Sequence, residues 1–181
     1  MKHFFKRTIA YFVDSAICYL LVMLLIQWAF LGQIRDQIGI TNEWFKNSVN
    51  MEIYVLLTIS LPVWIYFILM DSRLSTGTFG KRLFKLEVNH IIKRNKITLG
   101  RSVIRTILKL MPWEIAHLGI IFPVPMYFEE QPELRFLTIL GLALFLIYAF
   151  SILLSRKNQA LYDSLLKTIV LERSATSHNT R

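Results

Sequence analysis

Residues 136–155 read FLTILGLALFLIYAFSILLS, and no charged side chain stands between Arg135 and Arg156. A helix needs about 20 consecutive, mostly apolar residues to cross the hydrocarbon core of a bilayer. This stretch reaches that length without a charge, so it predicts a membrane-spanning helix. It decides the fold class because other parts of the chain are also long, mostly apolar runs.

Two segments nearer the N-terminus also predict spans. Residues 8–31 are mostly apolar with Asp14 as their only charge, and the only charge in residues 51–70 is Glu52, at their rim. Pro62 lies inside the second segment, where neighbouring helices can satisfy the carbonyl that a proline leaves free. A cleaved signal peptide is the rival interpretation of the N-terminus, but the apolar run is too long and no small-residue cleavage site follows it. We therefore expect both segments to stay in the membrane.

Residues 103–127 are apolar on average but carry Arg105, Lys109, Glu114 and His117, and Pro112 interrupts them. They therefore fit a kinked span, a re-entrant segment or an interfacial helix. Cytoplasmic loops of membrane proteins are enriched in Lys and Arg. If the segment crosses and both termini are cytoplasmic, only Arg35, Lys46 and Arg135 of the 21 basic residues lie outside. If it does not cross, this bias weakens. We predict an all-α membrane protein, a four-span transmembrane helix bundle.

The formal net charge of +9 then has a topological explanation: the cations face anionic lipid headgroups, and no nucleic-acid partner is expected. The single cysteine, Cys18, excludes an intramolecular disulfide and a Cys-based zinc site. No metal and no cofactor are expected. Residues 1–173 are predicted to form one transmembrane domain, and residues 174–181 a disordered tail.

The loop between the second and third spans has the period of a strand. In residues 84–92 apolar and polar side chains alternate, Lys93-Arg94-Asn95 resembles a turn, and residues 96–99 continue the pattern. This alternation predicts a small cytoplasmic β-hairpin.

Asp14 is the sharpest single signal for function. It lies on one helix face with Arg7, Tyr11 and Cys18. An ionisable side chain inside a span is costly, by about 2.5–3.5 kcal/mol at the centre of the helix. Such a group usually faces the bundle and finds a partner. It is a structural pair with another span, a proton or cation site, or a side chain that reaches the interface.

Further charges line the third span. Arg101 and Arg105 are expected to extend toward the cytoplasmic headgroups, whereas Lys109 is deeper. Glu114 and His117 are three residues apart on one face and suit proton transfer better than metal binding, which needs more ligands. We predict an ion or proton pathway that uses Asp14, Lys109, Glu114 and His117.

Residues 77–82 read GTFGKR, which differs from a nucleotide-binding phosphate loop in spacing and lacks its final Ser or Thr. Lys81 and Arg82 could hold a lipid phosphate, or the segment could be a tight turn. No Ser/His/Asp arrangement is visible, and we do not expect an enzyme.

Four motifs together resemble the RDD family of membrane proteins, which is named for one arginine and two aspartates. They are Arg7 with the sequence AYFVD at residues 10–14, then TFGKRLFKLEV at 78–88, ITLGRSVIR at 97–105 and ALYDSLLKTIV at 160–170. The resemblance covers residues 6–172 in order. It identifies Arg7, Asp14 and Asp163 as the family motif. Lys167 departs from the pattern, since a glycine is common there, and the patch around Glu114 and His117 belongs only to a subset.

The resemblance implies a bacterial cytoplasmic (inner) membrane protein and suggests transport, including sodium–proton exchange in some members. We predict a transporter or ion-exchange component that forms a homo-oligomer or joins a membrane partner protein. The alternative is a non-catalytic membrane scaffold or regulatory partner.

Two geometric predictions follow. Arg7 and Asp163 should meet at the cytoplasmic side if residues 161–171 form a surface helix. Asp14 should share a polar pocket with Lys109, Glu114 and His117. A cation close to Asp14 would make it a structural lock, and without one it would be a proton carrier.

Overall fold

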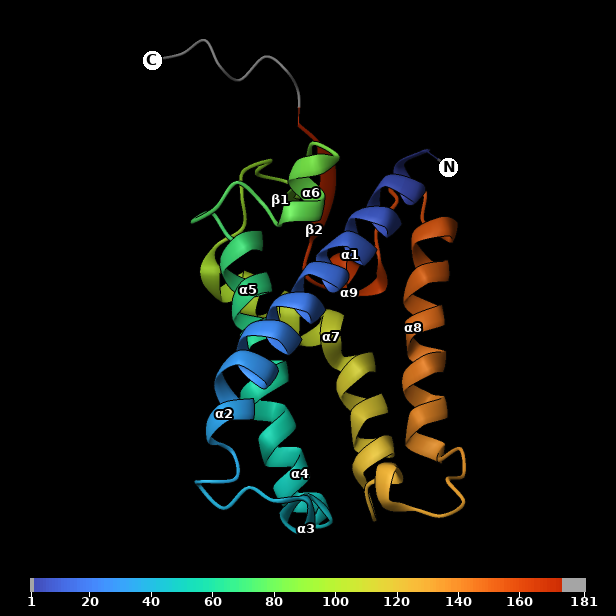
Figure 1. Cartoon of the computed structure of the whole chain (residues 1–181). Helices are drawn as coiled ribbons and strands as arrows, with labels where there is room; N and C mark the ends of the chain where they lie inside the picture. The colour runs from blue at the N-terminus through green and yellow to red at the C-terminus, as the bar shows by residue number, and fades with distance from the viewer. Residues whose placement is uncertain (1, 174–181) are drawn as a thin grey trace. The chain divides into compact units, whose positions relative to one another are not determined.

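The computed structural model describes residues 2–173, and Figure 1 gives the order of its elements. Four helical segments are long and apolar enough to cross a membrane: Phe4–Ile34, Ser48–Asp71, Leu99–Phe128 and Phe136–Leu154. The predicted all-α four-span fold is confirmed. The first three segments extend a few residues beyond the predicted spans because polar and charged residues continue the helices at their ends. The tail predicted for residues 174–181 lies outside the described part of the chain.

The first two spans each contain a stretch of wide π-helical turns. The first is built from α1 (Lys2–Leu21), η1 (Val22–Leu31) and α2 (Gly32–Ile34). After the short α3 (Asn42–Phe45), the second consists of α4 (Ser48–Val55), η2 (Leu56–Ser60) and α5 (Leu61–Asp71). Wide turns inside α-helices are rare and are often found at functional sites.

The third and fourth spans pack closely through glycine. The third comprises α7 (Leu99–Ile121), which continues through Pro112, and the single turn η3 (Met126–Phe128); the fourth is α8 (Phe136–Leu154). A Cβ atom on Gly141 of α8 would lie 2.6 Å from the Pro112 carbonyl oxygen of α7. Small residues let the backbones of membrane helices approach in this way.

Short elements follow the second and the fourth spans. They are α6 (Phe79–Leu83) and strand β1 (Leu86–His90), then α9 (Leu161–Leu165) and strand β2 (Thr168–Glu172). The strands pair antiparallel, with Leu86 opposite Glu172 and His90 opposite Thr168, and lie side by side in Figure 1.

The small two-stranded sheet is therefore confirmed, but its predicted second strand is wrong. Residues 96–99 contribute only a single bridge, between Asn89 and Lys96, and β2 pairs with β1 instead. The surface helix over residues 161–171, considered above as a condition, does not form, because α9 ends at Leu165. Lys167 takes a left-handed conformation with φ 53°, which turns the chain from α9 into β2.

The chain divides into two compact units, and we describe each by itself. Unit 1 contains residues 1–15, 66–106 and 148–181, and unit 2 contains residues 16–65 and 107–147. The apolar core of unit 1 joins both strands and α1, through Ala10, Leu86, Val88, Ile97 and Val170. In unit 2 the Arg135 guanidinium donates to the carbonyls of Gly119 and Phe122, at the C-terminal end of α7, where such groups have no partner within the helix.

Candidate functional site

Unit 1 encloses a balanced set of buried charges. Its cations are Arg7, Lys81 and Arg105, its carboxylates are Asp14, Asp71 and Asp163, and each is at most 8% exposed. They come from α1, α5, α6, α7 and α9, so most elements of the unit contribute one. We call these six side chains the buried charge network.

Asp163 lies between two guanidinium groups. Its Oδ2 accepts from Arg7 Nη2 at 2.6 Å, and its Oδ1 accepts from Arg105 Nε at 2.8 Å and from Thr168 Oγ1 at 2.9 Å. Burial by itself raises the pKa of Asp163, but Arg105 and Arg7 outweigh it and hold the pKa below its usual value. The predicted meeting of Arg7 and Asp163 is confirmed.

Arg105 connects Asp163 to a second carboxylate, Asp71. Arg105 Nη1 donates to Asp71 Oδ2 at 2.6 Å, and Lys81 Nζ donates to Asp71 Oδ1. Burial lowers the pKa of Lys81, and the attraction of Asp71 offsets this only in part. The expectation that Arg105 extends to the headgroups is wrong: it is 1% exposed, because Asp71 and Asp163 supply its counter-charges inside the fold.

The Arg105 guanidinium also stacks on an aromatic ring. Its Cζ lies 5.3 Å from the centroid of the Tyr162 ring, a cation–π contact. Burial, and next the neighbouring Asp163 carboxylate, raise the pKa of Tyr162 to about 12. The tyrosine therefore stays neutral beside the ion pairs at physiological pH.

Asp14 receives donors from α5, from α6 and from the residue that precedes α6. Its Oδ1 accepts from Tyr66 hydroxyl at 3.0 Å and from Gly80 N–H at 2.7 Å, and its Oδ2 accepts from Thr78 hydroxyl at 2.6 Å. Thr78 is also the N-cap of α6. Both oxygens of Asp14 are thus satisfied, and Lys81 is near enough to be stabilised by its charge.

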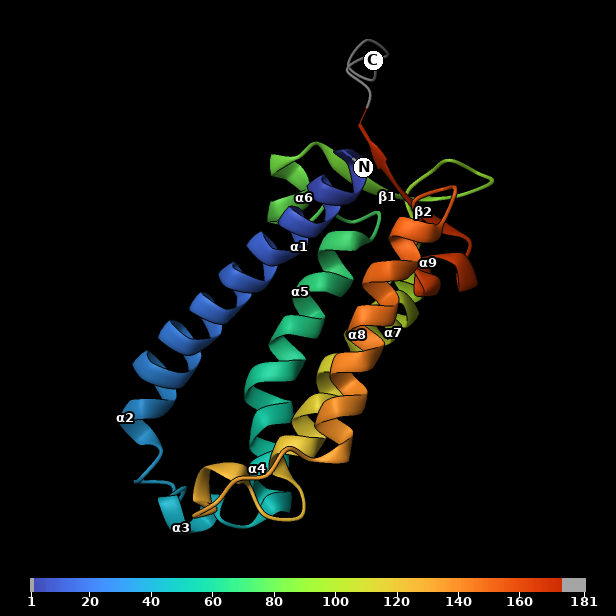
Figure 2. The same ribbon diagram turned by 90° about the vertical axis from the view of Figure 1, so that its right-hand side faces the viewer.

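Gly80 makes this arrangement sterically possible. Figure 2 shows α6 next to the N-terminal part of α1. A Cβ atom on Gly80 would lie 2.1 Å from the Ala10 carbonyl oxygen, so only glycine fits at this contact.

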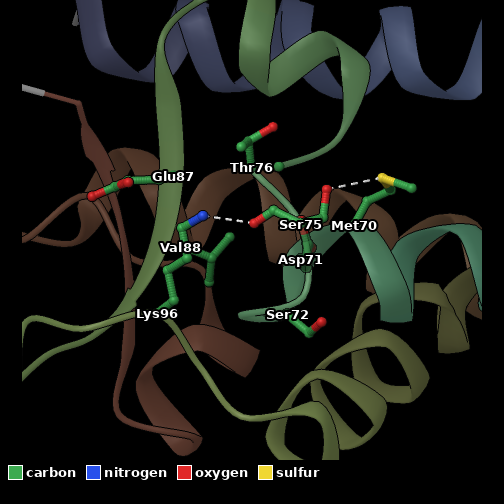
Figure 3. A pocket seen from close by; sticks show the side chains of 9 residues that line it. Met70, Asp71, Ser72, Ser75, Thr76, Glu87, Val88 and Lys96 are labelled. Carbon is green, nitrogen blue, oxygen red and sulfur yellow. Dashed lines mark hydrogen bonds between the residues drawn. The ribbon is translucent and has the colours of Figure 1, made fainter. Parts of the chain in front are cut away.

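Of the two residues predicted to contact lipid phosphate, the structure exposes one. Lys81 is buried against Asp71, whereas Arg82 is exposed and donates to the Gly77 carbonyl and the Ser75 hydroxyl. A small hollow lies beside Asp71, where Lys96 donates to the Ser75 carbonyl at 2.6 Å (Figure 3). Its volume is about 10 Å³, near the minimum for one water molecule.

Unit 2 holds the other predicted carboxylate, Glu114, with its own partners. Glu114 accepts from Ser60 hydroxyl and from Trp64 Nε1–H, each at 3.0 Å. Asp14 and Glu114 therefore have separate sets of donors. Lys109 is buried one helical turn after Arg105 along α7.

Two further groups of unit 2 have polar atoms without hydrogen-bond partners. Glu52, on α4, has a buried Oε2 that receives no donor from the described residues, and the charge of Glu114 acts on this carboxylate. The buried Nδ1 of His117 likewise has no hydrogen-bond partner among the described residues. Most buried polar atoms in proteins are hydrogen-bonded, so such atoms need a physical explanation.

The two π-helical segments also contact each other through polar side chains. Gln27 Nε2 donates to Thr58 Oγ1 at 2.7 Å, and the Tyr54 hydroxyl donates to Gln27 Oε1. Gln27 lies on η1 and Thr58 on η2, so the wide turns are linked by hydrogen bonds inside the spans. In the described part of the chain, no group of three or more His, Cys, Asp or Glu side chains is arranged to hold a metal ion.

Sequence reasoning missed Asp71, Tyr66, Thr78 and Glu52 as site residues. Asp71 and Glu52 stand at the ends of the second span, where a charge is ordinary. One signal could have indicated Asp71: the third predicted span carries two cations near its start, Arg105 and Lys109, and these need carboxylate partners.

Comparison with known proteins identifies one family. The family model described as the RDD family matches residues 1–167. No curated protein and no solved structure matches the chain.

Proposed function

The chain belongs to the RDD family of membrane proteins, and we propose that it moves protons or monovalent cations across the membrane through the carboxylates of unit 2. One observation carries this proposal. Glu52 and Glu114, both within candidate spans, interact electrostatically while Oε2 of Glu52 is buried without a donor.

Physical chemistry explains why such a pair suits exchange. An ionisable side chain inside a membrane is costly and is commonly part of an ion or proton pathway. The negative charge of Glu114 acts on the Glu52 carboxylate, and repulsion of this kind is relieved when a positive ion binds near the two groups. His117 follows Glu114 by three residues on α7, and its Nδ1 has no hydrogen-bond partner among the described residues, so in this proposal it is an acceptor for a proton.

The buried charge network has a different role in this proposal. Asp14 is saturated by Tyr66, Thr78 and Gly80, so it holds elements together instead of carrying an ion. The protein acts in the bacterial cytoplasmic membrane with both termini in the cytoplasm, and it is not an enzyme. In this proposal a homo-oligomer completes the pathway.

Proton flux in liposomes tests the proposal. Purified protein is reconstituted with a pH-sensitive dye inside, and a sodium or potassium gradient is imposed. We expect the wild type to change the internal pH, and Glu114→Gln and Glu52→Gln to abolish the change. The matched control is Glu130→Gln, which alters an exposed loop glutamate and should keep full flux. Wild-type flux equal to that of empty liposomes would reject transport.

A second function, a membrane scaffold or regulatory partner, is favoured by the saturation of Asp14 and by the charge balance of unit 1. It predicts no flux, and it predicts that Glu114→Gln leaves the protein's role in cells intact. Asp14→Asn then disrupts assembly with a partner, which co-purification from membranes detects.

A further inference from the structure

Unit 1 contains a groove that the buried charge network does not use. It is lined by Lys93, Thr98, Arg101, Ile104 and residues 165–167. Its volume is about 590 Å³, within the range of small-molecule sites. The lining combines three cations with apolar side chains and includes no carboxylate.

The three cations of the groove form no ion pair with the residues that the structure describes. Among the ion pairs of residues 2–173, none involves Lys93, Arg101 or Lys167. All three also act on His90. Burial lowers the pKa of His90 most, and the positive charges of Arg101, Lys93 and Lys167 lower it further. An anion in the groove would relieve this repulsion.

Lys167 occupies its place at a conformational cost. Its φ of 53° lies in the left-handed region, which glycine adopts freely and other residues avoid. A lysine at this turn gives the groove a cation that a glycine would not provide.

The apolar part of the groove lies at the start of a span. Arg101 and Ile104 belong to the first turns of the candidate span Leu99–Phe128. Ile104 is 51% exposed and Leu165 is 67% exposed. Cations next to exposed apolar side chains at a membrane boundary match the two ends of a phospholipid.

We propose that this groove binds one anionic phospholipid, whose phosphate lies among Lys93, Arg101 and Lys167 and whose acyl chains lie along Ile104 and Leu165. The site is separate from the proposed Glu52–Glu114 pathway and does not depend on it. Cations near a membrane surface each contribute about 1 kcal/mol to the binding of anionic lipid, which corresponds to about fivefold in affinity.

Native mass spectrometry of the full-length protein in detergent tests the site, with short-chain phosphatidylglycerol and phosphatidylcholine as the two probes. We expect tighter binding of phosphatidylglycerol. Lys93→Gln, Arg101→Gln and Lys167→Gly should each weaken it about fivefold. Glycine keeps the left-handed turn while removing the cation, so folding is preserved. Lys157→Gln is the matched control, an exposed lysine outside the groove.

Two further measurements separate a lipid from a free phosphate. Leu165→Ala should weaken phosphatidylglycerol binding, and excess inorganic phosphate should not displace the lipid. In ¹⁵N-histidine spectra, assigned with His90→Asn, phosphatidylglycerol should raise the pKa of His90. Equal binding of both lipids, or an unchanged affinity in all three cation variants, would overturn the proposal. If inorganic phosphate displaced the lipid, the groove would be a site for free phosphate, and the proposal of a phospholipid ligand would be wrong.

Discussion

Asp163 is a fully buried carboxylate of unit 1 and pairs with both Arg7 and Arg105. Burying charges is costly, and a buried ion pair often adds little stability compared with apolar residues of the same size. Removing one partner is different, because it leaves the other charges buried without compensation. The network therefore specifies which elements meet, and its members are not exchangeable one at a time.

Asp163→Asn should destabilise the protein by about 3–5 kcal/mol, because Arg7 loses its counter-charge and Arg105 keeps only that of Asp71. Asp14→Asn should cost less, about 1–3 kcal/mol, because its three direct donors are neutral groups that an amide oxygen can partly satisfy. Thermal unfolding of the purified variants in detergent measures both. Equal losses for the two variants would contradict this order.

The same residue predicts how stability depends on pH. The pKa of Asp163 is lower in the folded protein than its ordinary value, so the folded state favours the ionised carboxylate. Its stabilising contribution is complete above the unfolded pKa, about 3.9, and is lost as pH falls through the folded pKa below that. Unfolding temperatures measured from pH 7 downward should fall more steeply for the wild type than for Asp163→Asn. Parallel curves would show that Asp163 does not contribute to acid sensitivity.

At the scale of elements, the contact between α6 and α1 depends on one missing methyl group. Gly80→Ala would bring a Cβ atom within 2.1 Å of the Ala10 carbonyl oxygen and push α6 away from Asp14. Overpacking of this kind typically costs about 1–3 kcal/mol. The matched control is Gly100→Ala near the start of α7, where nothing lies within 4 Å of the added carbon. We expect a lower unfolding temperature for the first variant and an unchanged or slightly higher one for the second.

The elements that sequence predicted well are those fixed by local composition. Runs of about 20 apolar residues set the spans whatever their neighbours are. The period-two pattern of residues 84–92 likewise predicted a strand at β1. The partner of β1 could not be predicted locally, because β2 lies far away in sequence and its alternation is no stronger than that of residues 96–99. The positive φ of Lys167, which ends α9 early, has no sequence signal either.

The candidate site divides in the same way. The motif residues Arg7 and Asp163 could be paired from the sequence because both flank spans on one predicted side. Arg105 looked like an interfacial cation, since its partner Asp71 also stands at a span end, where charges are common. Only the three-dimensional fold brings both inside unit 1, so their roles depend on tertiary packing that no local pattern encodes.

At the scale of the whole molecule, the basic residues are divided unevenly between the two units. Only Arg35, Lys46, Lys109 and Arg135 belong to unit 2, and every other Lys and Arg belongs to the segments of unit 1. The buried cations of unit 1 are balanced by aspartates, but exposed ones such as Lys93 and Arg94 are not. Moving unbalanced cations across a membrane is unfavourable, and loops rich in Lys and Arg stay in the cytoplasm.

This distribution predicts the topology, which cysteine labelling in intact cells tests. On a Cys18→Ala background, single cysteines at the exposed positions Gln37 and Gln131 of unit 2 should react with a membrane-impermeant maleimide. Cysteines at the exposed positions Asn95 and Ser164 of unit 1 should react only after the membrane is permeabilised. Asn95 lies between the second and third candidate spans and Ser164 follows the fourth, so the pair tests two separate crossings. If only Ser164→Cys were labelled from outside, the chain would cross the membrane one time fewer than predicted. If both were labelled from outside, the orientation would be the opposite of the predicted one.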